Sequence, residues 1–256
     1  QLRCLQWNCC GIVAQTKPEE GLRKFLAFWD PDIVLLNEIK SKDEDLLKAA
    51  AFVGFNAFRR VSSTAPNNRS MRGTAILYQN RGKFVVTTGE HVALGVEGGG
   101  PAIEAIYADV QMASNGKKYR FICSYVRGHS ENNKWFDHAK DKFITWAGES
   151  NQTTIVTGDL NMAKSKYRPL FEKHGFIDTL KSEWATNKSK HKTSEIDYVM
   201  RHRSLHQSSV LCHKPVQPDG CVNAHCPIPF VVGEGVCVNT RGGYCMSGAC
   251  GFECDK

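Results

Sequence analysis

The sequence predicts an α+β fold in which strands outnumber helices. Short runs rich in β-branched and aromatic residues recur along the chain between turn-forming residues, which is typical of strands. Only four stretches carry helical signals. The composition changes only near residue 232, so we expect one domain over residues 1–232 and a Cys-rich extension over residues 233–256 that packs on it.

The predicted strands begin at the N-terminus. The run Ile-Val-Leu-Leu at 33–36 is apolar on both sides and is expected to be fully buried. Ser114-Asn115-Gly116 predicts the turn of a hairpin. The predicted strands are residues 2–9, 33–36, 55–60, 73–78, 83–87, 102–112, 118–126, 153–157, 195–200, 208–212 and 223–232.

The four predicted helices are marked by apolar spacing or by capping residues. The first begins with Pro18 and has acids in its first turn, and the second begins at the capping box Ser41-Lys-Asp-Glu44. An apolar aromatic stripe marks the third, and Gly175 ends the last. They span residues 18–29, 41–51, 133–148 and 170–174.

The composition is that of a globular protein, with 41% hydrophobic and 23% charged residues. No apolar run approaches the length that spans a membrane, so we expect no membrane span, and we expect a monomer. The net charge of +7 favours a polyanionic partner such as nucleic acid, although it also serves solubility.

Eleven cysteines indicate an oxidising compartment. The last four, Cys237, Cys245, Cys250 and Cys254, lie among Gly and Ser without the paired spacing of zinc ribbons, so we expect a disulfide-stapled extension and a secreted, extracellular protein. Three glycosylation sequons, at residues 68, 151 and 187, agree with secretion. A start at Gln1 agrees with removal of a signal peptide or with trimming.

Polar side chains lie at or near one end of several predicted strands. Strand ends meet at one rim of a sheet, so these side chains are expected to converge. Carboxylates, amides and a His suit a cation that prefers oxygen ligands, Mg²⁺ or Mn²⁺ rather than zinc, and a His paired with a carboxylate can activate water. The group is Asn8, Glu38, Tyr125, Asp159, Asn161, Asp197 and His225.

Five short motifs resemble, in the same order, those of the endonuclease/exonuclease/phosphatase superfamily, which includes deoxyribonuclease I, abasic-site endonucleases and the nuclease subunit of cytolethal distending toxins. They are Leu-Gln-Trp-Asn at 5–8, Ile-Val-Leu-Leu-Asn-Glu at 33–38, Gly-Asp-Leu-Asn at 158–161, Ile-Asp-Tyr-Val at 196–199 and His-Cys-Pro-Ile at 225–228. The resemblance implies a four-layer α/β/β/α sandwich of two mixed, mainly antiparallel sheets flanked by helices.

The resemblance also implies a metal-dependent hydrolase of phosphodiester bonds in DNA or RNA. Glu38 would ligate the divalent cation with Asn8 nearby, and Asp159 would orient or deprotonate the attacking water. His225, supported by Asp197, would be the catalytic His.

The remaining implied roles concern the substrate. Asn161 would hold the phosphate and Tyr125 would contact it, while Arg127 could clamp a phosphate in two contacts. Further cations and polar groups in loops are expected to contact substrate; they are Arg72, Arg127, His129 and Lys190.

Two residues depart from the family pattern. Ala224 stands where the family usually has an Asp before the final His, and Arg127 stands where several members have a His or Pro. Two alternatives therefore stay open beside a nuclease. One is a phosphoesterase of the same fold that acts on a lipid or inositol phosphate, and the other is a catalytically impaired member that binds nucleic acid or a protein.

Overall fold

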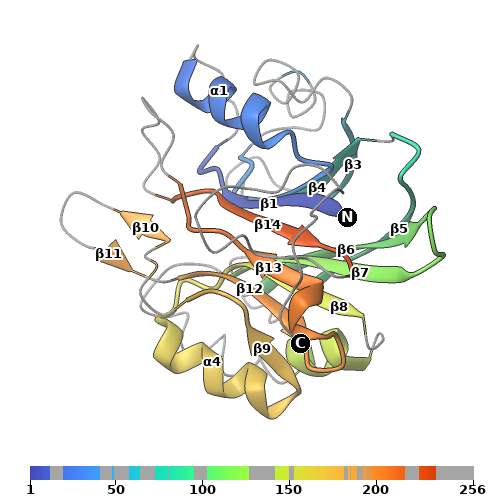
Figure 1. Ribbon diagram of the computed structural model, residues 1–256. Coiled ribbons are helices and arrows are strands. Elements are labelled where there is room, and N and C mark those ends of the chain that lie inside the picture. The colour runs from blue at the N-terminus through green and yellow to red at the C-terminus, as the bar shows by residue number, and fades with distance from the viewer. Residues whose placement is uncertain are drawn as a thin grey trace, which may run out of the picture.

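The computed structural model describes residues 1–11, 20–40, 48, 58–63, 73–79, 81–94, 103–126, 142–149, 153–181, 184, 186–188, 193–194, 196–216 and 225–234. These residues form two six-stranded sheets, one two-stranded hairpin and a few helices (Figure 1). The helical elements are α1 (Glu20–Trp29), α4 (Lys164–Lys173), η2 (Gln207–Ser209) and residues 142–149.

The first sheet has the strand order β13-β14-β1-β2-β4-β3 and the second β5-β6-β7-β8-β12-β9. Among the described strands, only β1 with β2 and β7 with β8 are parallel pairs, so both sheets are mixed and mainly antiparallel. The strands are β1 (Leu2–Asn8), β2 (Ile33–Asn37), β3 (Phe58–Ser63), β4 (Thr74–Gln79), β5 (Phe84–Leu94), β6 (Ile103–Met112), β7 (Lys118–Val126), β8 (Thr154–Asp159), β9 (Phe176–Asp178), β10 (Asn187–Lys188), β11 (Thr193–Ser194), β12 (Asp197–His202), β13 (Val210–Cys212) and β14 (Ile228–Val232).

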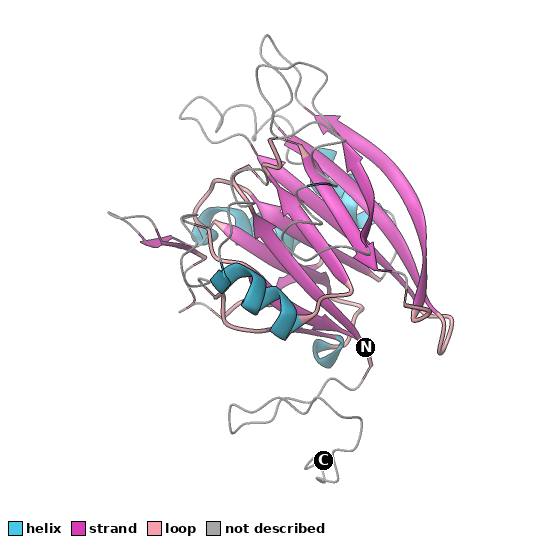
Figure 2. Cartoon of the chain, turned by 90° about the horizontal axis from the view of Figure 1, so that it is seen from above, coloured by secondary structure: helices cyan, strands magenta, loops and turns pink. Residues whose placement is uncertain are grey.

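The two sheets pack face to face, with helices on the outer faces (Figure 2). Alternation along each strand sends one set of side chains inward and the other outward. In β2, Leu35 lies in the core between the sheets, whereas Leu36 packs outward with Leu26 of α1. On the second sheet, Phe171 of α4 packs with Tyr198. The predicted four-layer sandwich is therefore confirmed.

Several predicted boundaries were wrong. The strand predicted at 55–60 is observed from Phe58 to Ser63, and the last strand begins at Ile228 rather than at residue 223. The helix predicted at 170–174 is α4, which starts at Lys164 and contains Pro169. Pro lacks an amide donor and usually interrupts a helix, so Pro169 hid the first part of α4. α4 also has no side-chain N-cap, so no capping residue marked its start. The short edge strand β9 was not predicted.

The extension that was predicted to be stapled by disulfides lies outside the described residues, apart from Gly233 and Glu234. Most of the helix predicted at 41–51 and the first part of the helix predicted at 133–148 also lie outside them. The six cysteines that the structure describes form no disulfide with one another: Cys4, Cys9, Cys10, Cys123, Cys212 and Cys226. None of the described helices is both long enough and apolar enough to cross a membrane.

Candidate active site

Two carboxylates face each other across neighbouring strands of the second sheet. Asp159 is the last residue of β8 and Asp197 the first of β12, and the two are directly paired in the antiparallel register. Both side chains are completely or almost completely buried. Like charges in directly opposed positions repel, so this pair needs a compensating positive charge or proton.

His225 supplies a positive charge beside the pair. Its Nδ1 lies 2.9 Å from Asp197 Oδ2 and 3.8 Å from Asp159 Oδ2. Burial alone would lower the pKa of His225, but the attraction of Asp197, then of Asp159, outweighs it and raises the pKa to about 9. Burial and the neighbouring Asp197 raise the pKa of Asp159 to about 8. These values describe the site without a metal ion.

The first sheet brings Asn8 and Glu38 to the same place. Asn8 Nδ2 donates to Asp159 Oδ2 at 2.8 Å and to Glu38 Oε1 at 3.4 Å, and it lies 3.5 Å from His225 Nε2. Glu38 Oε1 also accepts a hydrogen bond from Tyr125 OH at 2.6 Å. A single amide therefore joins the carboxylates of both sheets, because β1 and β2 are parallel and end at the same rim.

Asn161 follows β8, and two hydrogen bonds hold it in place, one from its backbone and one from its side chain. Its amide donates to Asp159 Oδ1 at 2.6 Å, and its side-chain Nδ2 donates to the Val126 carbonyl at 2.7 Å. The residue is exposed and has φ +48°. The side chain is thereby held at the surface of the site, where a phosphate can reach it.

Unusual backbone conformations surround these side chains. Five described residues other than glycine have positive φ, and four of them flank the site: Cys10, Glu38, Lys40 and Asn161. This conformation is unfavourable for residues with a Cβ atom and is found preferentially at functional sites. Two of them, Cys10 and Lys40, lie outside the sequence motifs, so the backbone conformation adds to the evidence for the same rim.

Gly158 permits the close approach of β7 and β8 beneath Asp159. Its φ is +148°, and a Cβ atom there would lie 1.8 Å from the Ser124 carbonyl oxygen. The contact is with backbone, so neither partner can move cheaply. The glycine of the motif at 158–161 is therefore required by packing.

Gly158→Ala is expected to lower the free energy of unfolding by about 3 kcal/mol or more, measured by urea denaturation. Gly148→Ala is the matched control, because Gly148 is helical and a Cβ there would have no atom within 4 Å. That control should gain up to about 1 kcal/mol. Equal stability of the two variants would contradict the assigned packing.

The donor set fits a divalent cation. Side-chain atoms of Asp159, Asp197 and His225 lie within 4.8 Å of one another, and the two carboxylates are the oxygen donors of this group. Asp197 Oδ1 is buried and has no hydrogen-bond partner among the described residues, which is costly unless a ligand or cation satisfies it. Glu38 adds a third carboxylate, and its pKa is lowered because hydrogen bonds from Lys40 and Tyr125 outweigh its desolvation.

The structure thus brings together seven of the predicted site residues. They are Asn8, Glu38, Tyr125, Asp159, Asn161, Asp197 and His225. The remaining predicted substrate-contacting residues, Arg72, Arg127, His129 and Lys190, lie outside the described residues, and so does Ala224.

Sequence reasoning missed two residues that contact this group. Lys40 Nζ lies 2.7 Å from Glu38 Oε2, and the only available signal was its position two residues after Glu38. Thr186 bonds the backbone at Asp197, and nothing in its polar loop distinguished it from its neighbours.

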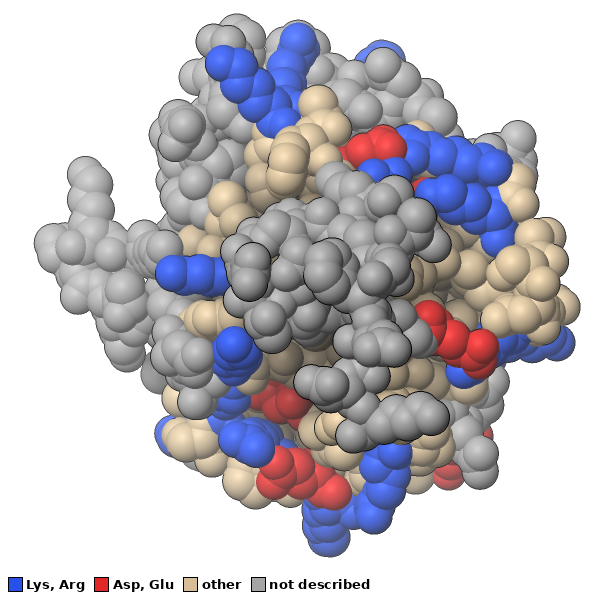
Figure 3. All heavy atoms as spheres, viewed as in Figure 1, with Lys and Arg blue, Asp and Glu red and all other residues tan. Residues whose placement is uncertain are grey.

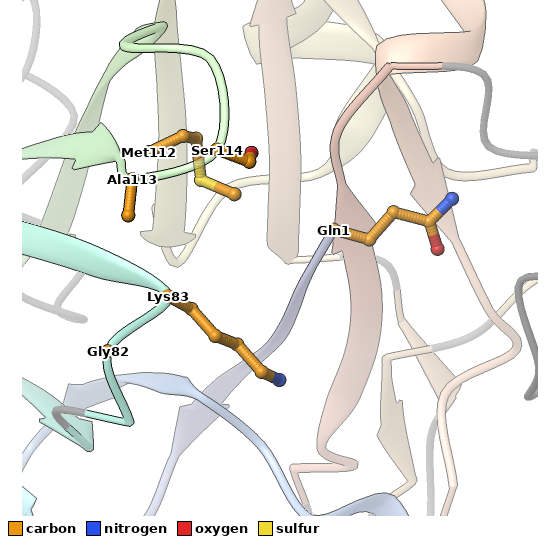
Figure 4. Close-up of a pocket in the computed structure, with 6 residues that line it drawn as sticks. All are labelled: Gln1, Gly82, Lys83, Met112, Ala113 and Ser114. Atoms are coloured by element: carbon orange, nitrogen blue, oxygen red, sulfur yellow. The ribbon is translucent and has the colours of Figure 1, made fainter.

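A surface hollow at the other end of the strands is unrelated to this group (Figure 4). β1 and β6 each have one end at the rim described above, Asn8 and Ile103, and the other end beside the hollow. Its cation, Lys83, is bonded to the buried Asp32 at 2.9 Å. The lining residues are Gln1, Gly82, Lys83, Met112, Ala113 and Ser114.

A protein-family model described as the endonuclease/exonuclease/phosphatase family matches residues 5–231. No curated protein matches the chain. Solved structures that are similar include D. rerio TDP2 complexed with a single-strand DNA product, at 14% identity and a TM-score of 0.66, with 90% of this chain and 98% of that chain covered.

Two further solved structures resemble the chain. An AP endonuclease from Leishmania major has 17% identity and a TM-score of 0.66, and covers 91% of this chain and 88% of its own. A mannosyl-6-phosphatase from Bacteroides thetaiotaomicron has 12% identity and a TM-score of 0.65, and covers 91% of this chain and 100% of its own. At such identities the similarity establishes the fold.

Proposed function

Because the chain belongs to the endonuclease/exonuclease/phosphatase family, we propose that it is a secreted, divalent-metal-dependent nuclease that hydrolyses phosphodiester bonds. The observation that carries the proposal is the buried cluster of Asp159, Asp197 and His225, which Asn8 connects to Glu38. The secreted location is supported by the cysteine-rich residues 233–256 and by the sequons.

Asp159 is the general base of the proposed mechanism and His225 is the general acid. Asp159 lies at the end of β8, where Asn8 donates to its Oδ2 at 2.8 Å, and its carboxylate would take a proton from the attacking water. A cation bound beside it would favour the ionised carboxylate that this role requires. His225 is protonated near neutral pH, because Asp197 accepts its Nδ1 proton and stabilises the imidazolium. His225 then stabilises the negative charge that develops on the phosphate and can donate a proton from Nε2.

The other residues orient the substrate and the carboxylates. Asn161, held by Val126 and Asp159, offers its side-chain amide at the surface for a phosphate oxygen. Tyr125 OH orients Glu38. Glu38, Asp159 and Asp197 are the carboxylates that would hold the divalent ion, Mg²⁺ or Mn²⁺. When bound, such an ion polarises the phosphoryl oxygen and lowers the pKa of a bound water.

A nucleic acid is the substrate that the charge favours. The chain carries a net charge of +7, and α4, which begins three residues after Asn161, exposes Lys166, Arg168 and Lys173. Figure 3 shows Lys and Arg side chains widely spread over the visible face, with fewer Asp and Glu. A positive charge that is spread over the surface suits a polymer with many phosphates, because several cations can attract it at once. A substrate with a single phosphate would need positive charge only at the site itself.

A substrate comparison tests the proposal. Plasmid DNA, single-stranded RNA, sphingomyelin and a sugar phosphate are incubated with the protein in Mg²⁺, with and without EDTA. We expect cleavage of nucleic acid that EDTA abolishes, and a large fall of the rate with increasing salt. Metal-dependent turnover of the lipid or sugar phosphate with intact nucleic acid would contradict the nuclease proposal.

The second candidate function is nucleic-acid binding without efficient hydrolysis, and Ala224 motivates it. Ala224→Asp separates the two functions. Under the nuclease proposal the unmodified chain already cleaves, and the substitution changes kcat by less than about tenfold. If the unmodified chain binds but does not cleave, and Ala224→Asp gains cleavage, the chain is a catalytically impaired member.

A further inference from the structure

Thr186 contacts the segment that carries Asp197. Its side-chain Oγ1 accepts hydrogen bonds from the backbone amides of Ile196 at 3.2 Å and of Asp197 at 3.1 Å. The side chain is completely buried. β9 pairs with β12 only from Met200 onward, so the hydroxyl oxygen serves as the acceptor that a neighbouring strand would otherwise provide.

The same residue also contacts the segment that carries His225. The Thr186 carbonyl accepts a hydrogen bond from the Cys226 amide at 2.8 Å. Ile196, one of the two residues that its side chain holds, accepts at its carbonyl from the Leu160 amide at 3.1 Å, next to Asp159. One threonine therefore connects the two segments that meet in the Asp197–His225 hydrogen bond. Its bonding partner Ile196 contacts a third segment, the one that carries Asp159.

These bonds determine where the Asp197 carboxylate lies. Asp197 and His225 are 28 residues apart in the chain, and their side chains meet at 2.9 Å. Loss of the Thr186 oxygen would remove the acceptor of the buried Asp197 amide and of the partly buried Ile196 amide, which is unfavourable enough to shift the start of β12. A shift of about 1 Å at a residue that positions a catalytic group can lower the rate greatly.

We propose that Thr186 is a positioning residue that sets the geometry of Asp197 against His225 through its side-chain oxygen and its carbonyl. The inference rests on the proposed function for its kinetic consequence, but its structural consequence can be measured without turnover. The described hydrogen bonds of Thr186 go to backbone amides of the segments that carry Asp197 and His225, so it acts through these two segments.

Three variants isolate the oxygen. Thr186→Val keeps the shape and removes the acceptor, whereas Thr186→Ser keeps the acceptor. Thr179→Val is the matched control, because the Thr179 hydroxyl also bonds the backbone of β12, at the Val199 carbonyl, two residues further along. We expect Thr186→Val to lower kcat by about tenfold or more with KM changed by less than about twofold. Thr186→Ser and Thr179→Val should stay within about threefold of the unmodified kcat.

The imidazole signal of His225 in the metal-free protein provides the measurement without turnover. We expect its Nδ1 proton to be protected from exchange in the unmodified protein, in Thr186→Ser and in Thr179→Val, and to exchange rapidly in Thr186→Val. If the chain hydrolyses nothing but this pattern appears, the positioning inference stands while the proposed function fails. Equal exchange of the His225 Nδ1 proton in Thr186→Val and Thr186→Ser would overturn the inference, and so would equal kcat of the two variants in a chain that does hydrolyse a phosphodiester.

If Thr186→Val does not fold, amide hydrogen exchange in the unmodified protein tests whether the Thr186 oxygen holds the start of β12. The Ile196 and Asp197 amides are expected to be protected to the extent of the β12 amides beyond them. Exchange of these two amides at the rate of an open chain would overturn the inference, since the oxygen would not be holding them.

Discussion

His225→Ala is expected to lower kcat by about 1,000-fold on whichever phosphodiester the protein cleaves, because a positioned acid or base contributes about 10²- to 10⁴-fold to such reactions. The variant also leaves Asp159 and Asp197 facing each other without the imidazolium that lies 2.9 Å from one and 3.8 Å from the other. Steady-state kinetics in Mg²⁺ measure the effect. KM is expected to change much less than kcat, since His225 acts on charge that develops during the reaction.

His206→Ala is the control for this substitution. His206 is exposed, and its Nδ1 contacts only the neighbouring Ser208 in the bonds that the structure describes. Its removal should leave kcat within about twofold. A His225→Ala protein that is folded and turns over as fast as His206→Ala would remove His225 from the mechanism.

Asp159→Asn is expected to act in opposite directions on activity and on stability. Activity should fall by at least about 1,000-fold, because the amide can neither accept a proton from water nor balance a cation. In protein freed of divalent ions by EDTA, the free energy of unfolding at pH 8 should rise by at least about 1 kcal/mol, since the substitution removes a buried charge beside Asp197.

The pH dependence distinguishes this stabilisation from a general one. Burial and Asp197 raise the folded-state pKa of Asp159 to about 8, above its ordinary value of 3.8. The folded state therefore binds the proton more tightly, and this stability is complete below pH 3.8 and lost as the pH rises toward 8 and beyond. The difference between Asp159→Asn and the unmodified protein should be small at pH 4 and grow up to about pH 8, as thermal or urea unfolding at each pH measures.

Asp109→Asn is the matched carboxylate control. Asp109 is partly exposed and forms an ion pair with Arg120 at 2.6 Å on the second sheet. This substitution should leave activity unchanged and should not stabilise the protein at pH 8. An Asp159→Asn protein that is less stable than the unmodified protein at every pH would show that the ionised carboxylate is accommodated without cost.

The arrangement of the strand ends could be predicted because the signals were local. β2 is a continuous apolar run that ends in Asn37, with Glu38 next to it, and the residues directly after a buried strand lie at the rim of the sheet. At the motif around Asp159, a strand is followed directly by a glycine and then by two polar residues, Asp159 and Asn161. Each of these signals depends only on neighbours in the chain, so the sequence contains it directly.

Other parts of the site depend on contacts between distant segments and had no local signal. Thr186 is one of several polar residues in a loop, and its bonds to Ile196 and Cys226 exist only after the sheets have formed. The closeness of Gly158 to the Ser124 carbonyl is likewise a property of the packed pair β7–β8. α4 was predicted too short because Pro169 interrupts the helical signal although the helix continues through it.

Cleavage of a defined phosphodiester substrate by the unmodified protein, Asp159→Asn and His225→Ala, each in Mg²⁺ and in EDTA, tests the central claim most directly. The claim is that the cluster of Asp159, Asp197 and His225 is a metal-dependent hydrolytic centre. We predict that only the unmodified protein in Mg²⁺ cleaves at an appreciable rate. Cleavage by the unmodified protein that persists in EDTA, or that either substitution leaves intact, would contradict it.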